Sequence, residues 1–217
     1  MSLIKKIGCI AAMMAMALPG FAHASNDPVM DAQVKRINDE WARIKYQVQG
    51  KDQQYQQLDK LAVQAAQVVA KYPGHAEPLL WQGIVTSEEA AQAPMFKQLG
   101  FATAARDILL KAYKIDPLAE KGGVAMSLGV LYYKVPGWPI GFGDAKKAKA
   151  YLNQGIVVDP SSLDTNWFFG DYWVTKGDNN RARAFFTKAL SAPVNPDRPV
   201  WDAGRRAEVH AAMAKLK

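Results

Sequence analysis

Residues that could carry out catalysis are few and scattered in this chain of 217 residues. Outside an N-terminal leader two histidines remain, His75 and His210, and their spacing matches no usual zinc site. The single cysteine, Cys9, lies inside the leader, which leaves no thiol nucleophile. The adjacent acids Glu88 and Glu89 are of a kind common on helix surfaces, and the sequence contains no phosphate-binding glycine loop and no Gly-x-Ser-x-Gly elbow. We therefore expect a protein that is not an enzyme and that holds no metal and no cofactor.

Binding chemistry is concentrated in segment 134–143, which contains two prolines, three glycines, Trp138 and Phe142. Proline fixes φ and removes a backbone donor, whereas glycine permits positive φ, so this segment cannot be helical and should form one stiff loop. Two alternatives follow for its aromatic side chains. Trp138 and Phe142 either fold inward and fill the edge between adjacent helical hairpins, or they form a ledge against which a ligand stacks.

A second candidate for binding is the arginine pair Arg205 and Arg206, with Arg198 nearby. A guanidinium group matches a carboxylate or a phosphate, so the pair could bind an anion, although such pairs are also common on solvated helix faces. A further possibility is that Arg205 forms a salt bridge with Asp171 or Asp144 and ties the last helix to the edge of the preceding units.

The first 24 residues have the pattern of a signal peptide, 1–24. Lys5 and Lys6 precede an uncharged run over 7–18, and small residues form a cleavage site that ends at Ala24. The run is twelve residues long, whereas a membrane-spanning helix needs about 20, so we expect an exported chain without a membrane span. We therefore expect the processed protein in the periplasm, where its lack of cysteine suits an oxidising compartment.

The charge balance argues against nucleic acid as a partner. The chain has 27 basic and 20 acidic residues, a net charge of +7, and removal of Lys5 and Lys6 with the leader leaves 25 basic against 20 acidic residues, or +5. The basic residues are spread between acids rather than clustered in one stripe, which nucleic-acid binding would favour. A modest positive charge instead favours acidic partners or an anionic envelope surface through long-range attraction.

Prolines that close apolar, helix-like stretches recur at intervals of 44, 43 and 36 residues. These are Pro73, Pro117, Pro160 and Pro196. The pattern that starts at Gly143 also recurs from Gly177, 34 residues later, with small and aromatic residues in register. Periods of this size indicate stacked helical hairpins.

The residues within these units resemble those of tetratricopeptide-repeat (TPR) proteins. A glycine in each of three first helices, Gly83, Gly129 or Gly170, is followed in the second helix by a small, a large apolar and another small residue. These second-helix residues are Ala105, Leu109 and Ala112, then Ala148, Leu152 and Gly155, then Ala182, Phe186 and Ala189. Small residues let two helix backbones approach closely, and the large residue fills the remaining space. The resemblance implies an all-α fold, an α-solenoid of antiparallel helical hairpins with helical caps.

These units set the expected boundaries within one helical domain over 25–217. The three repeats are expected at 77–117, 120–160 and 162–196. Residues 25–73 match the repeat poorly, and we interpret them as a capping hairpin at the N-terminus. Residues 202–217 have the spacing of a final amphipathic helix that covers the last hairpin.

Two of the three units are longer than the TPR standard. Twelve positions separate the first-helix glycine from the second-helix alanine after Gly170, whereas 19 do so after Gly129 and 22 after Gly83. The differences are insertions of seven and ten residues, and we place both in the turn within the hairpin. In a stacked array they should then lie side by side on one edge.

The TPR pattern also implies which residues line the concave face of the solenoid. The first helices provide Glu77, Leu80, Ile84, Ser87, Gly123, Met126, Val130, Tyr133, Asp164, Trp167, Asp171 and Val174. Such a mixture suits an extended peptide or a small apolar molecule. The candidate binding residues are Trp138, Phe142, Met126, Tyr133, Trp167, Asp171 and Arg205. Alternatively, the N-terminal hairpin or the final helix fills this groove itself.

A narrower resemblance covers about residues 77–217. Segments 136–144, 168–172 and 202–208, which read PGWPIGFGD, FFGDY and DAGRRAE, are similar to those of exported bacterial TPR proteins related to the partner subunit of TRAP (tripartite ATP-independent periplasmic) transporters. We expect a non-catalytic periplasmic scaffold or adaptor that binds a protein or peptide partner on its concave face. The alternative is a partner subunit of a periplasmic uptake system, or its small-molecule ligand-binding subunit.

Overall fold

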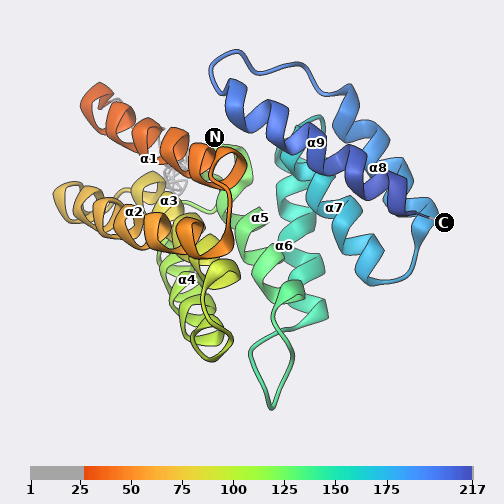
Figure 1. Cartoon of the computed structure of the whole chain (residues 1–217), viewed down its shortest axis with the longest axis horizontal. Coiled ribbons are helices and arrows are strands. Elements are labelled where there is room, and N and C mark those ends of the chain that lie inside the picture. The colour runs from red at the N-terminus through yellow and green to blue at the C-terminus, as the bar shows by residue number, and fades with distance from the viewer. Residues whose placement is uncertain (1–26, 217) are drawn as a thin grey trace, which may run out of the picture.

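The computed structural model describes residues 27–216, so the expected leader 1–24 and its cleavage site lie outside the described residues. Nine α-helices form the regular structure of this range, arranged as successive antiparallel hairpins (Figure 1). They are α1 (Pro28–Gln47), α2 (Lys51–Lys71), α3 (Ala76–Gln92), α4 (Met95–Ile115), α5 (Ala119–Lys134), α6 (Ala145–Val158), α7 (Leu163–Thr175), α8 (Asn179–Ser191) and α9 (Pro199–Lys215). The expectation of an all-α solenoid is confirmed for these residues. No helix among them has both the length and the hydropathy needed to cross a bilayer.

Close approach of helix backbones defines the three hairpins α3–α4, α5–α6 and α7–α8. A Cβ atom on Gly83 would lie 2.6 Å from Leu109, one on Gly129 would lie 2.8 Å from Leu152, and one on Gly170 would lie 2.3 Å from Phe186. The alanines that flank these large residues are fully buried; they include Ala105, Ala112, Ala148, Ala182 and Ala189. The glycine in each first helix therefore faces the large apolar residue of its second helix, because a larger side chain there would hold the two backbones apart.

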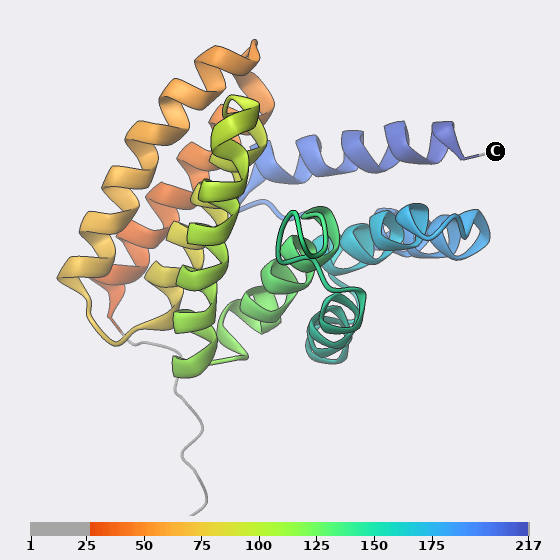
Figure 2. The same cartoon turned by 90° about the horizontal axis from the view of Figure 1, so that it is seen from below.

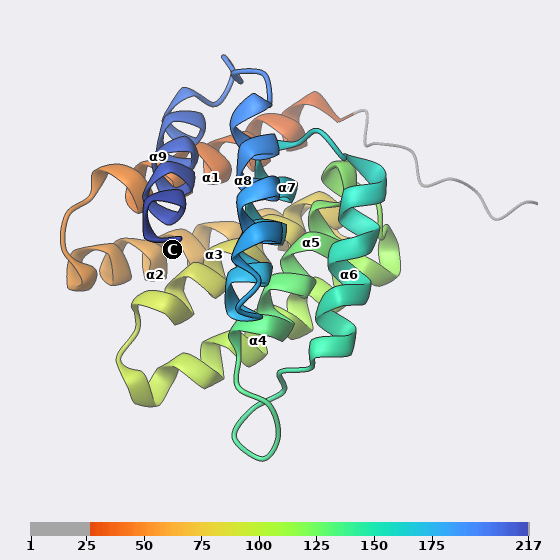
Figure 3. The same cartoon turned by 90° about the vertical axis from the view of Figure 1, so that its right-hand side faces the viewer.

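The solenoid closes on itself through its two end helices. The odd-numbered helices α1, α3, α5, α7 and α9 each contact the next in that order, and α1 also contacts α9. We call these five helices the inner ring; the even-numbered helices lie outside it. Figure 2 shows α9 reaching back from the α7–α8 hairpin toward the N-terminal helices, and α9 lies beside α1 in Figure 3. A Cβ atom on Gly204 would lie 2.3 Å from the ring of Tyr46, so the two end helices cross tightly.

Ring closure also joins the two ends of the chain in one hydrophobic core. Met30 and Trp41 of α1 and Leu58 of α2 belong to the same buried cluster as Phe186 of α8 and Val209 of α9. A second cluster of buried residues runs from α3 to α7, and Phe185 of α8 packs against it. The end helices of the chain therefore cover the concave side of the solenoid. This agrees with the alternative in which the N-terminal hairpin or the final helix fills the groove.

The two insertions take different forms. In the first repeat the extra residues lengthen α3 to 17 and α4 to 21 residues and leave a turn of two residues, 93–94. The expectation of a longer turn in this repeat is wrong, because the added residues continue the helices. In the second repeat the extra residues form the loop 135–144. The two insertions meet at one edge, where Leu99 lies 3.3 Å from the position of a Cβ atom on Gly141.

We expect Gly170→Ala to lower the free energy of unfolding by about 2 kcal/mol, because the new methyl group would overlap the buried ring of Phe186. Gly100 offers a matched control, since it also lies in a helix but a Cβ atom there meets nothing within 4 Å. Gly100→Ala should raise the free energy of unfolding by about 0.5–1 kcal/mol, because alanine favours helix more than glycine does. Urea denaturation measures both values, and equal effects would contradict the tight crossing at Gly170.

Candidate functional site

Charged side chains line the inside of the inner ring, and Arg205 of α9 lies at their centre. Its Nε donates to Asp164 of α7 at 2.6 Å, and a second guanidinium nitrogen donates to Glu208 of α9. The guanidinium carbon lies 5.6 Å from the ring centroid of Trp167 and 4.9 Å from that of Phe168. Burial by itself would lower the pKa of Arg205, but Asp164 and the other neighbours raise it above its ordinary value. A permanent charge therefore ties α9 to α7.

Lys45 of α1 continues this network toward α3. Its Nζ donates to both carboxylate oxygens of Glu88, at 2.8 and 2.9 Å, and lies 3.7 Å from Glu208. The hydroxyl of Tyr46 donates to Glu208 at 3.3 Å. Burial by itself would raise the pKa of Glu88, but Lys45 and, more weakly, Arg205 lower it below its ordinary value. Three helices, α1, α3 and α9, are thus joined through two carboxylates.

A third set of contacts joins α5 to α7. The Tyr133 hydroxyl donates to Asp171 at 2.6 Å, and Nζ of Lys134 lies 2.6 Å from the same carboxylate oxygen. Burial, together with the charge of Asp171, raises the pKa of Tyr133 well above its ordinary value. The phenol therefore remains a hydrogen-bond donor at neutral pH.

Of the seven candidate binding residues, five lie outside the loop 135–144, and four of these five lie inside the inner ring. Tyr133, Asp171 and Arg205 take part in the network, and Trp167 stacks on Phe186 with ring centroids 5.3 Å apart. Met126 does not lie there: it is 4% exposed, and its Cε lies 2.5 Å from the position of a Cβ atom on Gly155 of α6. The expectation that Met126 lines the concave face is therefore wrong, because it fills the space that this glycine leaves.

Arg205 pairs with neither Asp171 nor Asp144. Asp144 is the N-cap of α6 and accepts two backbone N–H groups at 2.9 Å, and Asp171 is taken by Tyr133 and its neighbour. Asp164 is the partner instead. The expected tie between the last helix and the repeats exists, but it runs through a different acid.

Lys45, Glu88 and Glu208 are members of the network that the sequence did not reveal. They come from three helices far apart along the chain, so no local pattern brings them together. One signal was present. Gly204 lies inside the final helix, and a glycine inside a helix often has a packing reason, which here is the close approach of Tyr46.

The loop 135–144 directs its two aromatic rings differently. Phe142 is half-buried, packs edge-on against Tyr132 with ring centroids 5.7 Å apart, and lies 4.4 Å from the guanidinium carbon of Arg106. Trp138 is 89% exposed. Each of the two alternatives for this loop therefore describes one side chain: Phe142 fills the edge between hairpins, whereas Trp138 is available for contact.

Exposed apolar side chains lie on both of the segments that meet where Leu99 approaches Gly141. Met95 and Phe96 begin α4 and are 86% and 84% exposed, and Leu99 follows one turn later. Trp138 and Ile140 project from the neighbouring loop. We call these five residues the insertion edge.

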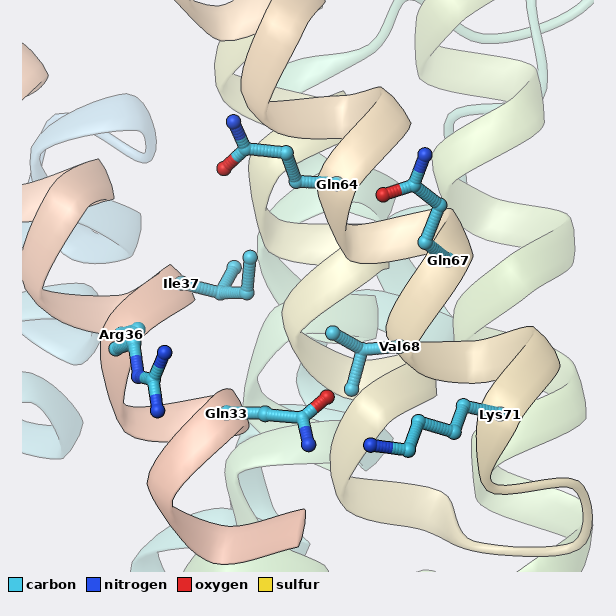
Figure 4. A pocket seen from close by; sticks show the side chains of 7 residues that line it. All are labelled: Gln33, Arg36, Ile37, Gln64, Gln67, Val68 and Lys71. Carbon is cyan, nitrogen blue, oxygen red and sulfur yellow. The ribbon is translucent and has the colours of Figure 1, made fainter. Parts of the chain in front are cut away.

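An open groove separates α1 from α2 (Figure 4). It encloses about 350 Å³, with the apolar side chains Ile37 and Val68 at its floor. Polar side chains surround them, and these are Gln33, Arg36, Gln64, Gln67 and Lys71. A smaller groove of about 210 Å³ lies between α1 and the start of α9. No group of three or more His, Cys, Asp or Glu side chains in residues 27–216 is placed to hold a metal ion.

Comparison with solved structures shows the same class of fold. The chain resembles a thermophilic TPR protein of Thermus thermophilus, with a TM-score of 0.57 over 85% of this chain and 91% of that chain. The two sequences are 15% identical, so the likeness concerns the fold. The sequence matches no protein-family model and no curated protein.

The two rings of the loop should differ in their effect on stability. Phe142→Ala should lower the free energy of unfolding by about 2 kcal/mol, because it removes a ring packed on Tyr132 and Arg106. Trp138→Ala should change it by less than about 0.5 kcal/mol, because that ring is exposed. Thermal and urea denaturation measure both. A loss of similar size at Trp138 would mean that this ring is also structural.

Two adjacent acids should respond to pH in opposite directions. Burial and the nearby Asp59 raise the pKa of Glu89 to about 7 from an ordinary 4.5. The folded state then holds a proton that the unfolded state releases, so stability falls as pH rises from 4.5 to about 7. The pKa of Glu88 is lowered instead, so its ion pair with Lys45 contributes at neutral pH and is lost under acid conditions.

Glu89→Gln should therefore raise the free energy of unfolding at pH 8 by about 1–2 kcal/mol and leave it nearly unchanged at pH 5. Glu88→Gln is the matched variant, and it should lower stability at pH 8 because half-buried Lys45 loses its counter-charge. Urea denaturation at both pH values gives the comparison. Parallel pH profiles for the two variants would show that the environments of these carboxyl groups do not differ as described.

Proposed function

We propose that this chain is a non-catalytic adaptor that is exported to the periplasm and binds a protein or peptide partner. The TPR-like fold supports the class of function. The leader 1–24 supports export, with cleavage after Ala24. The groove between α1 and α2 carries the proposal for the binding site, because contacts within the chain occupy the concave face that we first expected to bind the partner.

The groove has the chemistry that an extended peptide requires. Its three glutamines offer both donors and acceptors to a peptide backbone, and the floor formed by Ile37 and Val68 can accept an aliphatic side chain. Arg36 and Lys71 add positive charge at the rim, which favours a segment with acidic residues. We therefore assign the groove to an acidic, partly apolar peptide segment of a partner protein.

The experiment places a photo-reactive amino acid at Gln64 or Gln67, both exposed on the rim, in cells that express the full chain. Irradiation should give a discrete adduct in the periplasmic fraction, and mass spectrometry identifies the partner. Lys111, exposed on α4, is the control position and should give no such adduct. Recovery of the processed chain beginning at Ser25 tests export at the same time.

Charge reversal sharpens this test. Arg36→Glu with Lys71→Glu should reduce the adduct at Gln64 by about tenfold, whereas Lys111→Glu with Lys114→Glu should leave it unchanged. Equal adducts at groove and control positions, or no effect of charge reversal, would contradict the assignment of the groove. Adducts with membrane subunits of a transporter would place the chain in an uptake system.

A further inference from the structure

We propose that the insertion edge docks the protein on an anionic membrane surface. Its five apolar residues come from two different repeats and are exposed to an unusual degree: Trp138 is 89% exposed, Met95 86%, Phe96 84%, Ile140 69% and Leu99 40%. Exposed apolar patches of this kind mark interaction sites on folded proteins. Tryptophan is enriched where proteins meet the headgroup region of a bilayer, because its ring is apolar and its N–H remains solvated.

The loop holds its apolar residues outward rather than letting them collapse onto the protein. The N–H of Gly143 donates to the carbonyl of Pro136 at 2.9 Å and closes the loop at its base. A Cβ atom on Gly143 would lie 2.0 Å from a backbone oxygen, so glycine is required for this closure. Phe142 anchors the loop on Tyr132. Little conformational freedom is left to lose on docking, which favours binding.

Charge complementarity selects a lipid surface over a protein face. Segments 93–106 and 134–149, which carry the insertion edge, contain six basic residues and one acidic residue. The basic residues are Lys97, Arg106, Lys134, Lys146, Lys147 and Lys149. Arg106 forms a salt bridge with Asp107 and Lys134 with Asp171, so the charge available to headgroups comes from the other four lysines. The acid is Asp144, which is engaged as the N-cap of α6. Lysine is depleted in the cores of protein interfaces, whereas lysine beside exposed tryptophan and phenylalanine is typical of attachment to anionic headgroups.

Docking at this edge leaves the groove between α1 and α2 free. The loop 135–144 projects from one extremity of the molecule in both Figure 1 and Figure 3, and α1 and α2 lie away from that extremity in both views. The attachment is therefore independent of the proposed partner site. An adaptor held in this way would present its groove beside the membrane.

Vesicle flotation tests the proposal with the gene product as purified from the cell, so that any contribution of the leader is shared by every variant. The vesicles are phosphatidylcholine, with or without about 30% phosphatidylglycerol. The protein should bind the anionic vesicles and bind phosphatidylcholine at least about tenfold more weakly. Phe96→Asp with Trp138→Asp should weaken binding to the anionic vesicles by about tenfold or more. Val157→Asp with Val194→Asp is the control, because these exposed valines lie away from the insertion edge and the charge change is the same.

Tryptophan fluorescence reports on the docked edge directly. All six tryptophans lie in the described residues, and Trp138 is the one that is largely exposed. Anionic vesicles should shift its emission to the blue, and brominated lipid should quench it. Trp138→Phe should keep vesicle binding within about threefold and lose the blue shift, since phenylalanine preserves the apolar contact.

Several outcomes would overturn the proposal. One is equal binding to vesicles with and without phosphatidylglycerol, and another is equal loss in the edge and control variants. If sedimentation shows a dimer that the edge variant dissociates, and vesicles do not bind, the insertion edge is a contact between two copies of the chain. If photo-adducts form at Trp138 with a protein while vesicles do not bind, the edge is a protein site. None of these results bears on adducts at Gln64.

Discussion

Contact between the first and last helices is the constraint on which the rest of this fold depends. In an open repeat array each unit touches its neighbours, and stability is roughly a sum over adjacent units. Here α1 meets α9, with Gly204 giving Tyr46 room to approach, and the two chain ends share one core. The entropic cost of closing so long a stretch of chain grows slowly with its length, so one good contact can maintain it. Closure then makes the units interdependent.

Closure also explains why the concave face is charged and yet mostly shielded from water. Buried charges are costly unless they are paired, and three of the polar contacts here join different helices. Arg205 joins α9 to α7, Lys45 joins α1 to α3, and the Tyr133 hydroxyl joins α5 to α7. Hydrophobic contacts tolerate sliding, whereas a carboxylate must meet its partner at a defined position. The network therefore fixes the register in which the helices of the inner ring meet. Its side chains are occupied within the chain, which leaves few of them free for a partner.

Local spacing predicted the hairpins well, because the contacts that define them are short in sequence. Gly170 and Phe186 face each other across their hairpin, as the repeat implies, and so do the equivalent pairs in the two longer units. Ring closure could not be predicted in this way, since Tyr46 and Gly204 belong to opposite ends of the chain. Met126 was misplaced because Gly155, where the other two repeats have alanine, leaves space in α6 that the methionine side chain fills. The ten-residue insertion was misplaced because helix-forming residues extend a helix as readily as they form a turn.

The same closure accounts for where the free surfaces lie. Because α1 packs against α9 and α3, it contacts α2 less extensively than the helices of the other hairpins contact each other, and the groove above Ile37 and Val68 results. The insertion edge has a separate origin, since two repeats of unequal length place Phe96 and Trp138 beyond the reach of the core. A closed ring thus leaves the outside of the molecule, rather than its concave face, as the place where we propose that partners bind. The groove and the edge differ in chemistry, one amide-lined and one aromatic and basic, which is why we assign them to different kinds of partner.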